Sequence, residues 1–122
     1  MTVKIVYLMK RKPGMTMDEF KAYYEDHHVP LINRLLPHAS DYRRNFVEPV
    51  QHAAGHMAEG RSSDHLFDVM TELTYPSEEM YQKTLDALAD PETGGIIAAD
   101  EAKSFDRLSM RSFRVDKRRT SC

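Results

Sequence analysis

The sequence predicts an α+β fold in which a four-stranded antiparallel sheet carries helices on one face. Three observations lead to this prediction. They are the order strand, helix, strand, strand, helix, strand; a length of 122 residues, which suits one compact domain; and apolar residues that alternate along the strands. We assign residues 1–116 to that domain and residues 117–122 to a basic tail that frays in solvent.

The first strand covers Val3 to Met9, a β-branched and apolar run that ends before the Pro13-Gly14 turn signal. Thr16 and Glu19 then form the Thr-x-x-Glu pattern of a capping box, in which each side chain satisfies a backbone N–H of the other residue. The first helix is therefore expected to begin near Met17.

Aromatic and apolar residues recur along one face of this helix. Phe20, Tyr24, His27 and Leu31 stand at positions i, i+4, i+7 and i+11. Pro30 lacks an N–H and its ring clashes with the preceding turn. We therefore expect the helix to be kinked or interrupted there.

The middle of the chain predicts two strands on either side of a long loop. Residues 41–48 alternate between apolar and polar side chains, and residues 65–75 form another strand-like run. Residues 49–64 between them are rich in Gly, Ala, Ser and His. A loop of this length in a compact domain is often functional.

The last part of the chain predicts two helices and a strand. Ser77 caps a helix over residues 78–88, and the segment 90–95, with Pro and two Gly residues, is expected to break the chain. Residues 96–103 form a short helix and residues 108–115 the final strand. This completes the element order of the split βαβ, or ferredoxin-like, fold.

Both faces of the predicted sheet carry apolar residues. In the first strand Val3, Ile5 and Tyr7 point to one side, while Val6 and Leu8 point to the other. The helices can cover only one side, and monomers rarely leave a large apolar surface bare. We therefore expect a homodimer that packs sheet on sheet.

Composition argues against several classes of function. The formal net charge of −2 gives no field that attracts nucleic acid, and no apolar run approaches the roughly 20 residues of a membrane span. These two observations predict a protein without nucleic-acid or membrane partners. The lone cysteine, Cys122, cannot form an internal disulfide, so we expect a cytoplasmic location. Without a phosphate-binding loop, nucleophile elbow or cysteine nucleophile, the chain must use acid–base chemistry, bind without reacting, or borrow a cofactor.

A set of motifs is spread over the chain outside the loop 49–64 and the tail. They are Lys10-Arg-Lys-Pro-Gly-Met-Thr16, Glu19-Phe20, Tyr23-Tyr24, His28-Val-Pro30-Leu31, Tyr42-Arg-Arg-Asn45, Asp68, Glu72 and Tyr75-Pro-Ser-Glu-Glu79. Together they make the chain similar to the EthD-type branch of the dimeric α/β-barrel superfamily. That resemblance implies a homodimer with one pocket per subunit, between the sheet and its helices. Relatives in the superfamily include cofactor-free isomerases of muconolactones, polyketide cyclases, decarboxylases and small monooxygenases.

One such relative, the methylmuconolactone isomerase, resembles the chain in the third strand and the helix after it. Its pocket histidine falls near His27 and His28, and a pocket tyrosine falls on Tyr42. Its pocket cysteine falls on Leu73, so that group is missing here. The place of its second histidine is open to three residues, His52, His56 and His65.

The adjacent histidines are the main candidates for catalysis. His28 stands one turn from Tyr24, which can orient it or donate a proton. An imidazole with an ordinary pKa of about 6.5 suits proton transfer near neutral pH. His27 belongs to the apolar stripe and is a rival for the same role. The structural alternative is that His28 closes the helix before Pro30 with a hydrogen bond.

Polar residues on the strands are the second group of candidates. Asp68 and Glu72 share one strand face, where they can act as a base, orient a histidine, or simply pair with an arginine. Arg44 and Asn45 can grip a carboxylate or phenolate, or take part in surface ion pairs. His52 and His56 have the i, i+4 spacing of a helical metal site, but Gly55 disfavours a helix there, so we expect no metal.

The sequence as a whole predicts a small cofactor-independent lyase or isomerase for an aromatic, polyketide-like or lactone small molecule. The alternatives are a non-catalytic small-molecule-binding accessory protein and a cofactor-free monooxygenase. The expected acid–base residues are His28, His27, Tyr24, Tyr42 and Asp68. The expected substrate contacts are Arg44, Asn45, His65, Glu72 and Leu73.

Overall fold

The computed structural model describes residues 2–48 and 66–121. The elements follow in the order β1 (Val3–Arg11), α1 (Met17–Tyr23), the π-helical turn η1 (Tyr24–His28), α2 (Val29–Leu35), β2 (Asp41–Phe46), β3 (Val69–Tyr75), α3 (Glu78–Ala89), α4 (Pro91–Glu101) and β4 (Phe105–Val115). The predicted loop 49–64 and the candidates His52, His56 and His65 lie outside the described residues.

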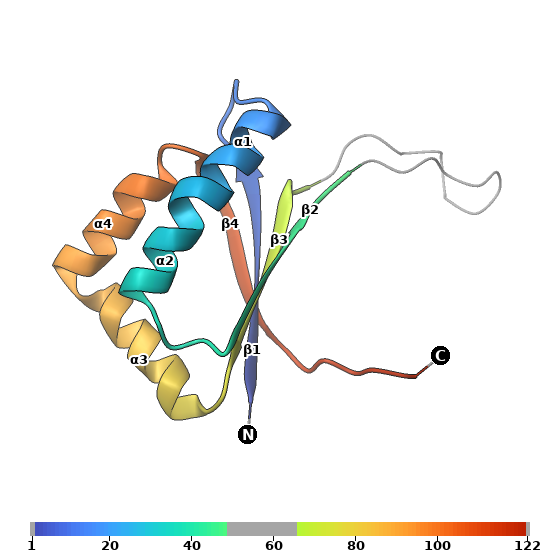
Figure 1. Cartoon of the computed structure of the whole chain (residues 1–122), viewed down its shortest axis with the longest axis vertical. Helices are drawn as coiled ribbons and strands as arrows, with labels where there is room; N and C mark the ends of the chain where they lie inside the picture. The colour runs from blue at the N-terminus through green and yellow to red at the C-terminus, as the bar shows by residue number, and fades with distance from the viewer. Residues whose placement is uncertain (1, 49–65, 122) are drawn as a thin grey trace.

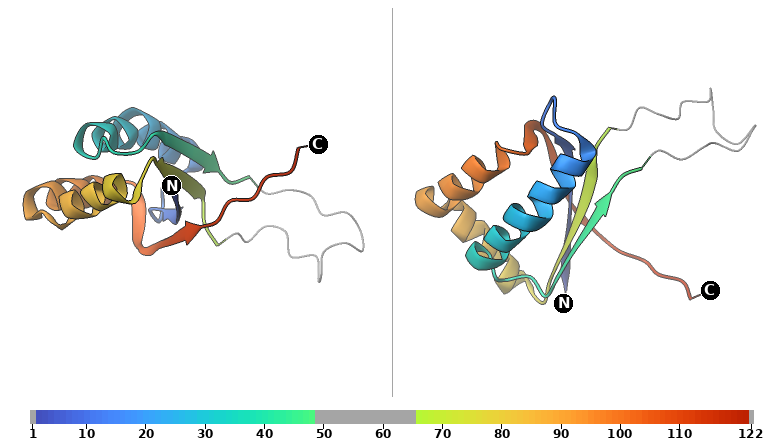
Figure 2. Two further views of the ribbon diagram at one scale, coloured as in Figure 1. Left: turned by 90° about the horizontal axis from the view of Figure 1, so that it is seen from below. Right: turned by 45° about the horizontal axis from the view of Figure 1, so that its top comes forward.

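The four strands form one antiparallel sheet in the order β2-β3-β1-β4. All the helices lie on one face of this sheet, as the views in Figures 1 and 2 agree. The predicted ferredoxin-like fold class is therefore confirmed. The chain leaves the sheet after β4 on the side away from the helices (Figure 1).

The connection from β1 to α1 has the turn and cap that the sequence predicts. The Met15 N–H donates to the Lys12 carbonyl at 3.1 Å, and Gly14 has a φ of 86°. Pro13 before this glycine gives the residue pattern of a type II turn. The capping box is complete, because the N–H of Thr16 donates to Glu19 Oε1 at 2.9 Å and the N–H of Glu19 to Thr16 Oγ1 at 3.1 Å.

Pro30 interrupts the first helix by widening the turn before it. The N–H of Val29 donates to the carbonyl of Tyr24, which is the i→i+5 spacing of a π-helix. Proline removes one i→i−4 bond and its ring crowds the carbonyl four residues earlier, so a wider turn at this place relieves both effects. The π turn holds Tyr24 and His28, and both of their side chains are buried.

The segment 90–95 does not break the chain as expected; it forms the start of α4. The Asp90 side chain accepts from the Thr93 N–H at 3.0 Å, and Pro91 occupies the first turn, where a missing N–H costs nothing. Gly94 lies so close to α3 that a Cβ there would stand 2.4 Å from the Leu88 carbonyl oxygen. The glycine therefore permits a close approach of two helices.

Strand β4 begins at Phe105, three residues before the predicted start. A bulge shifts its register against β1 between Leu8 and Lys10, so the first residues of β4 lose the simple alternation that marks a strand. Strand β3 begins at Val69, later than the predicted residue 65. The antiparallel pairing of Val3 with Tyr75 and of Met9 with Val69 fixes the sheet register.

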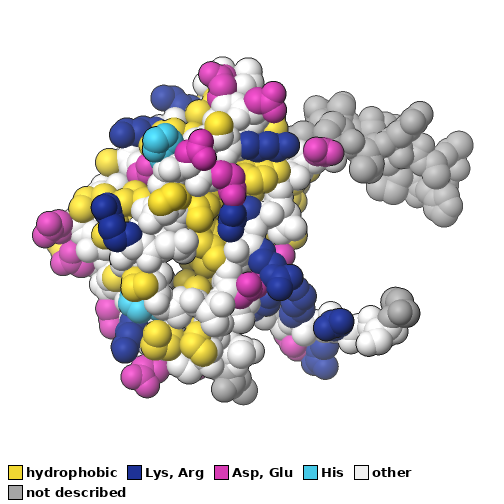
Figure 3. Space-filling view, viewed as in Figure 1, with side chains coloured by type: hydrophobic (Ala, Val, Ile, Leu, Met, Phe, Trp, Pro, Cys, Tyr) yellow, Lys and Arg dark blue, Asp and Glu magenta, His cyan; other side chains and the backbone are white. Residues whose placement is uncertain are grey.

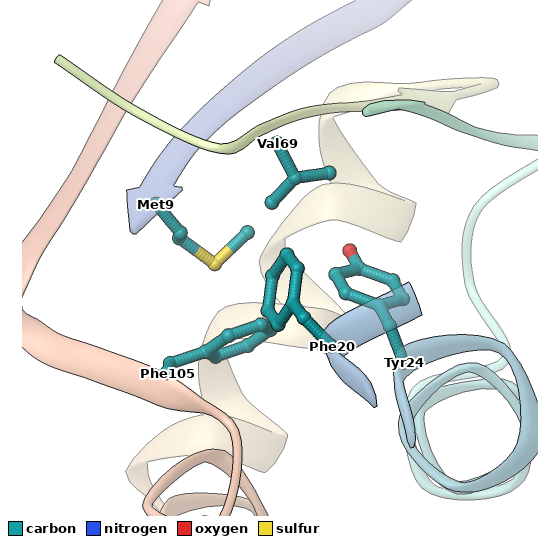
Figure 4. Packing of buried hydrophobic residues seen from close by; sticks show 5 residues of the cluster. All are labelled: Met9, Phe20, Tyr24, Val69 and Phe105. Atoms are coloured by element: carbon teal, nitrogen blue, oxygen red, sulfur yellow. The ribbon is translucent and has the colours of Figure 1, made fainter. Parts of the chain in front are cut away.

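The core lies between the sheet and the helices and has two parts. One holds Met9, Phe20, Tyr24, Val69 and Phe105, whose side chains point toward one another in Figure 4. The rings of Phe20 and Tyr24 meet edge to face, with centroids 5.9 Å apart. The second part is built from Val3, Ile5 and Tyr75.

No helix of the described residues covers the opposite face of the sheet. Phe113, which pairs with Val6 in the register, is 50% exposed, and Val115 is 37% exposed.

Charges of both signs are spread over the side of the molecule seen in Figure 3, and apolar side chains gather there between helices and sheet. Among the helices of the described residues, none has the length and apolar character that crossing a membrane requires.

Candidate functional site

A cavity of about 80 Å³ lies between the two parts of the core, and we call it the pocket. All four strands and the elements from η1 to α4 contribute to its wall. Its lining residues are Tyr7, Met9, Tyr24, His28, Ile32, Leu36, Tyr42, Thr71, Leu73, Tyr75, Thr84, Leu88, Ile97, Glu101 and Met110. The wall is thus mainly apolar and carries a few hydroxyls, one imidazole and one carboxyl group.

His28 is the imidazole in this wall, and only 5% of the residue is exposed. Its Nδ1 lies 2.8 Å from Asp100 Oδ2. A carboxylate only accepts hydrogen bonds, so we assign the ring proton to Nδ1, which leaves the lone pair on Nε2. No hydrogen bond to Nε2 is found within the part of the chain that the structure describes.

The surroundings of His28 keep its ring neutral. Burial lowers the pKa of His28, and the hydrogen bond and charge of Asp100 offset only part of that effect. The rings of Tyr24 and Phe105 pack edge-on against the imidazole, each with its centroid 5.0 Å away. A neutral imidazole with a free Nε2 in an apolar wall can accept a proton from a bound molecule.

Asp100 is held by a second donor, the Tyr23 hydroxyl, which lies 2.6 Å from Oδ1. Both carboxylate oxygens therefore have partners, Tyr23 just before the π turn and His28 at its end. Burial and the hydrogen bond to Asp100 raise the pKa of Tyr23 to about 12, so its hydroxyl stays protonated and donates. The chain Tyr23–Asp100–His28 fixes both the orientation and the tautomer of the imidazole.

The two carboxyl groups near the pocket, Asp100 and Glu101, occupy the last turn of α4. The C-terminal end of a helix carries partial negative charge, so anionic side chains are disfavoured at that position. Burial raises the pKa of Glu101, while Arg107, whose Nε lies 3.4 Å from Oε1, acts in the opposite direction. Placing two acids there opposes the local helix electrostatics, and ionisable groups with perturbed pKa values in a cleft are candidates for a functional site.

Hydroxyl groups form the polar part of the wall next to the sheet. The Tyr24 hydroxyl, which points from the helix toward the sheet in Figure 4, lies 2.5 Å from Thr71 Oγ1. The Tyr42 hydroxyl donates to that of Tyr24 across 3.4 Å. Burial raises the pKa of both tyrosines, so both remain neutral donors. Across the pocket, Thr84 Oγ1 lies 2.9 Å from His38 Nδ1.

Four of the residues singled out by sequence line the pocket together: Tyr24, His28, Tyr42 and Leu73. His27, the rival of His28, instead points to solvent and lies against the Tyr23 ring with centroids 4.8 Å apart. The π turn separates the two histidines in this way, with one in the core and one on the surface.

The other described candidates lie outside the pocket wall. Asp68 is buried at the end of the sheet, where its Oδ2 accepts from the Arg11 N–H at 2.8 Å. Glu72 lies on the uncovered face beside Lys4, and Asn45 Nδ2 donates to Glu72 Oε2 at 3.0 Å. Arg44 forms a two-pronged ion pair with Glu25.

Sequence reasoning missed Asp100, Glu101, Tyr23 and Thr71 as parts of this site. The first two gave a usable signal, since consecutive acids at the end of a predicted helix violate the preference for cations there. Thr71 gave none, because a threonine in a strand is ordinary. Within residues 2–48 and 66–121, no three His, Cys, Asp or Glu side chains lie close enough to hold a metal ion.

Comparison with solved structures finds the same fold in several proteins. An ethyl tert-butyl ether degradation (EthD) family protein from Bacillus halodurans C-125 aligns with a TM-score of 0.61 at 21% identity, over 97% of this chain and 100% of its own. An EthD-like protein from Ralstonia eutropha JMP134 aligns with a TM-score of 0.59 at 19% identity, over 98% and 96%. A dimeric ferredoxin-like protein of unknown function from Jannaschia sp. CCS1 aligns with a TM-score of 0.54 at 11% identity, over 96% and 100%.

Sequence comparison identifies the family of the chain, which the shared fold alone does not. Curated protein sequences gave no significant match. The model of the EthD domain matches residues 12–108, which include α1, the π turn with His28, and Asp100 and Glu101 at the end of α4. Because this match covers most of the chain and agrees with the motifs of the first helix, the chain belongs to the EthD family.

Proposed function

We propose that the chain is a cofactor-independent lyase or isomerase that acts by acid–base chemistry on a ring-containing small molecule, such as an aromatic, polyketide-like or lactone compound. The observation that carries this proposal is the buried His28, which is held through Nδ1 by Asp100 and lines an apolar pocket. A neutral imidazole so oriented is suited to act as a general base near neutral pH.

The proposed reaction begins with removal of a proton from a carbon next to a carbonyl group. His28 Nε2 takes the proton, and the electron pair of the broken C–H bond moves to the carbonyl oxygen to give an enolate. The Tyr24 hydroxyl, or that of Tyr42 once it turns from Tyr24, donates a hydrogen bond to this oxygen, which supports the developing charge. The imidazolium is stabilised by Asp100 and returns its proton to a different atom of the enolate, which completes an isomerisation.

The environment of the pocket favours this chemistry. The wall around His28 is mainly apolar, and hydrogen bonds and charge interactions are stronger where water is excluded. The raised pKa values of Tyr24 and Tyr42 keep both hydroxyls protonated, so they can donate without becoming charged. The proposed steps use these side chains and need no bound cofactor.

We also propose that the active form is a homodimer that packs through the uncovered face of the sheet. Exposed apolar residues such as Phe113 and Val115 support this, since a partner would remove them from water. The structurally similar protein from Jannaschia sp. CCS1 is described as dimeric. The pocket lies on the other face, so this packing leaves it free to bind a ligand.

The proposal is tested by following exchange of the α-protons of cyclohexanone in D₂O by ¹H NMR. We expect the native protein to accelerate the exchange and His28→Ala to remove about 10²–10⁴-fold of that acceleration, the usual contribution of a general base. His28→Gln, which keeps a group able to bond Asp100, serves as a second variant if His28→Ala does not fold. His27→Ala is the matched control, because its side chain is the neighbouring exposed imidazole.

A second candidate, a non-catalytic binding protein, is favoured by the largely apolar wall, which includes Met9, Ile32 and Met110. In that case the protons of cyclohexanone would exchange at the same rate in the presence of the native protein and of either histidine variant. Equal rates in native protein and His28→Ala, with both folded, would therefore replace the lyase or isomerase proposal by this one.

A further inference from the structure

We propose that the pocket selects uncharged ring compounds over carboxylates, and that Glu101 is the specificity-determining residue. This rests on the site proposed above and names the class of molecule that it takes. The inference concerns the charge of the ligand, and it is drawn from the lining residues, the position of Glu101 and the contacts of two neighbouring arginines.

The described wall of the pocket offers no positive charge to an anion. Among the described residues that line it, none is a lysine or an arginine. The imidazole of His28 is kept neutral, and its N–H is already donated to Asp100. A carboxylate entering the pocket would lose its water shell without a cation to replace it, which is strongly unfavourable.

Two arginines that contact residues of this wall are each paired with a carboxylate. Arg44 lies behind the Tyr42 ring, with its guanidinium carbon 5.1 Å from the ring centroid, and its Nε donates to Glu25 Oε2 at 2.9 Å. Arg107 lies beside Glu101, with its Nε 3.4 Å from Oε1, and its own side chain is half exposed. Each guanidinium is thus already paired with a carboxylate, Arg44 with Glu25 outside the wall and Arg107 with Glu101 of the wall itself.

Glu101 adds an acidic group to the pocket itself. Its side chain is only 14% exposed and lines the wall at the end of α4. A second carboxylate in the same cavity would be repelled by an ionised Glu101, or would force it to take up a proton before binding. Either route weakens the binding of an anion and leaves that of a neutral molecule unaffected.

The hydroxyl groups of the wall suit a neutral oxygen-bearing ring. Those of Tyr24, Tyr42 and Thr71 lie together next to the sheet, and that of Thr84 lies across the cavity. Each can donate to or accept from a keto or hydroxyl group. The apolar residues between them are suited to the faces of a ring. A cyclic ketone or phenol fits this distribution, whereas a ring acid does not.

The test compares the binding of benzamide and benzoate, two probes of the same shape that differ by one charge. Calorimetry at pH 7 with the native full chain should give benzamide an affinity at least about ten-fold higher than benzoate, since like charges in a poorly solvated site repel each other. Glu101→Gln should reduce this ratio by about ten-fold. The matched control is Glu92→Gln, which removes an exposed carboxylate from the first turn of the same helix and should leave the ratio unchanged.

Several results would overturn the inference. They are a native affinity for benzoate equal to or above that for benzamide, no binding of benzamide, and a ratio that is the same in native protein and folded Glu101→Gln. The native comparison remains decisive if the variant does not fold. Because these measurements need no turnover, a failure here leaves the His28-dependent exchange of cyclohexanone protons as a separate result.

Discussion

The two faces of the sheet use alternate residues of the same strands for different purposes. On the face under the helices, Tyr7 and Thr71 line the pocket. On the other face Lys4 and Glu72, from the same two strands, form an ion pair with both side chains 16% exposed. Lys117 from the tail reaches the same carboxylate at 3.4 Å.

The two faces of the sheet differ in the charged groups that they tolerate. The pocket wall on the covered side has hydroxyls, one imidazole and one carboxyl group, and the uncovered face has paired ions among exposed apolar side chains. A strand with period-two alternation separates these environments by a single residue. We therefore expect substitutions on the covered face to alter stability and ligand chemistry, and those on the uncovered face to alter association.

The largest effect should come from the core of the covered face. Phe20 is fully buried among aromatic rings, so Phe20→Ala should lower the free energy of unfolding by about 3–5 kcal/mol. Phe113→Ala, on the uncovered face, removes a half-exposed ring and should cost far less in the dissociated chain. Urea unfolding at a protein concentration low enough to dissociate a dimer compares the two. Equal losses would show that the faces do not differ in this way.

The next effect concerns the uncovered face. Phe113→Asp would bury an unpaired carboxylate in the proposed dimer and should raise its dissociation constant by roughly 100-fold or more. Sedimentation should then show a shift from twice the chain mass toward the single chain. Leu85→Asp, which changes an exposed leucine of α3 in the helical layer, is the matched control. Loss of the dimer in that control, or its persistence in Phe113→Asp, would place the interface elsewhere.

A smaller effect is expected at the carboxylate that orients His28. Asp100→Asn removes the contribution that raises the pKa of His28, so burial alone remains and the pKa should fall further below 6.5. Proton exchange should slow by about 10- to 100-fold, because the imidazole loses its fixed orientation. An NMR titration of the His28 ring checks the direction of the pKa change.

The same variant makes a prediction for stability against pH. A histidine whose folded pKa lies below its unfolded value binds fewer protons in the folded state, so stability falls as pH drops below about 6.5. In Asp100→Asn the folded pKa of His28 lies lower still, so this loss of stability continues to a lower pH. A pKa of His28 that rises in the variant would mean that Asp100 does not act on the imidazole as described.

Much of the fold was predictable because local physics and the hydrophobic pattern agree. The capping box at Thr16, the turn at Gly14 and the cap at Ser77 all have the roles that the sequence predicts. The start of α4 was not predictable from the same rules. Gly94 reads as a helix breaker in isolation, and only the nearby carbonyl of Leu88 explains why glycine is needed there.

The site was predictable only in part, because its geometry depends on long-range contacts. His28 and Tyr24 follow from helical spacing, but a regular α-helix predicts that His27, not His28, lies on the buried stripe. The π turn before Pro30 reverses that expectation by shifting the helix face. Asp100 reaches His28 across 72 positions of sequence, and no local pattern records such a contact.

The central claim is that His28 Nε2 faces the reacting atom of a ligand in the pocket. The most direct measurement is a crystal structure of the protein with cyclohexanone bound. We predict an α-carbon of the ring within about 3.5 Å of Nε2, and its oxygen within hydrogen-bonding distance of the Tyr24 or Tyr42 hydroxyl. A ring that occupies the pocket with neither contact, or that binds only outside it, would contradict the account.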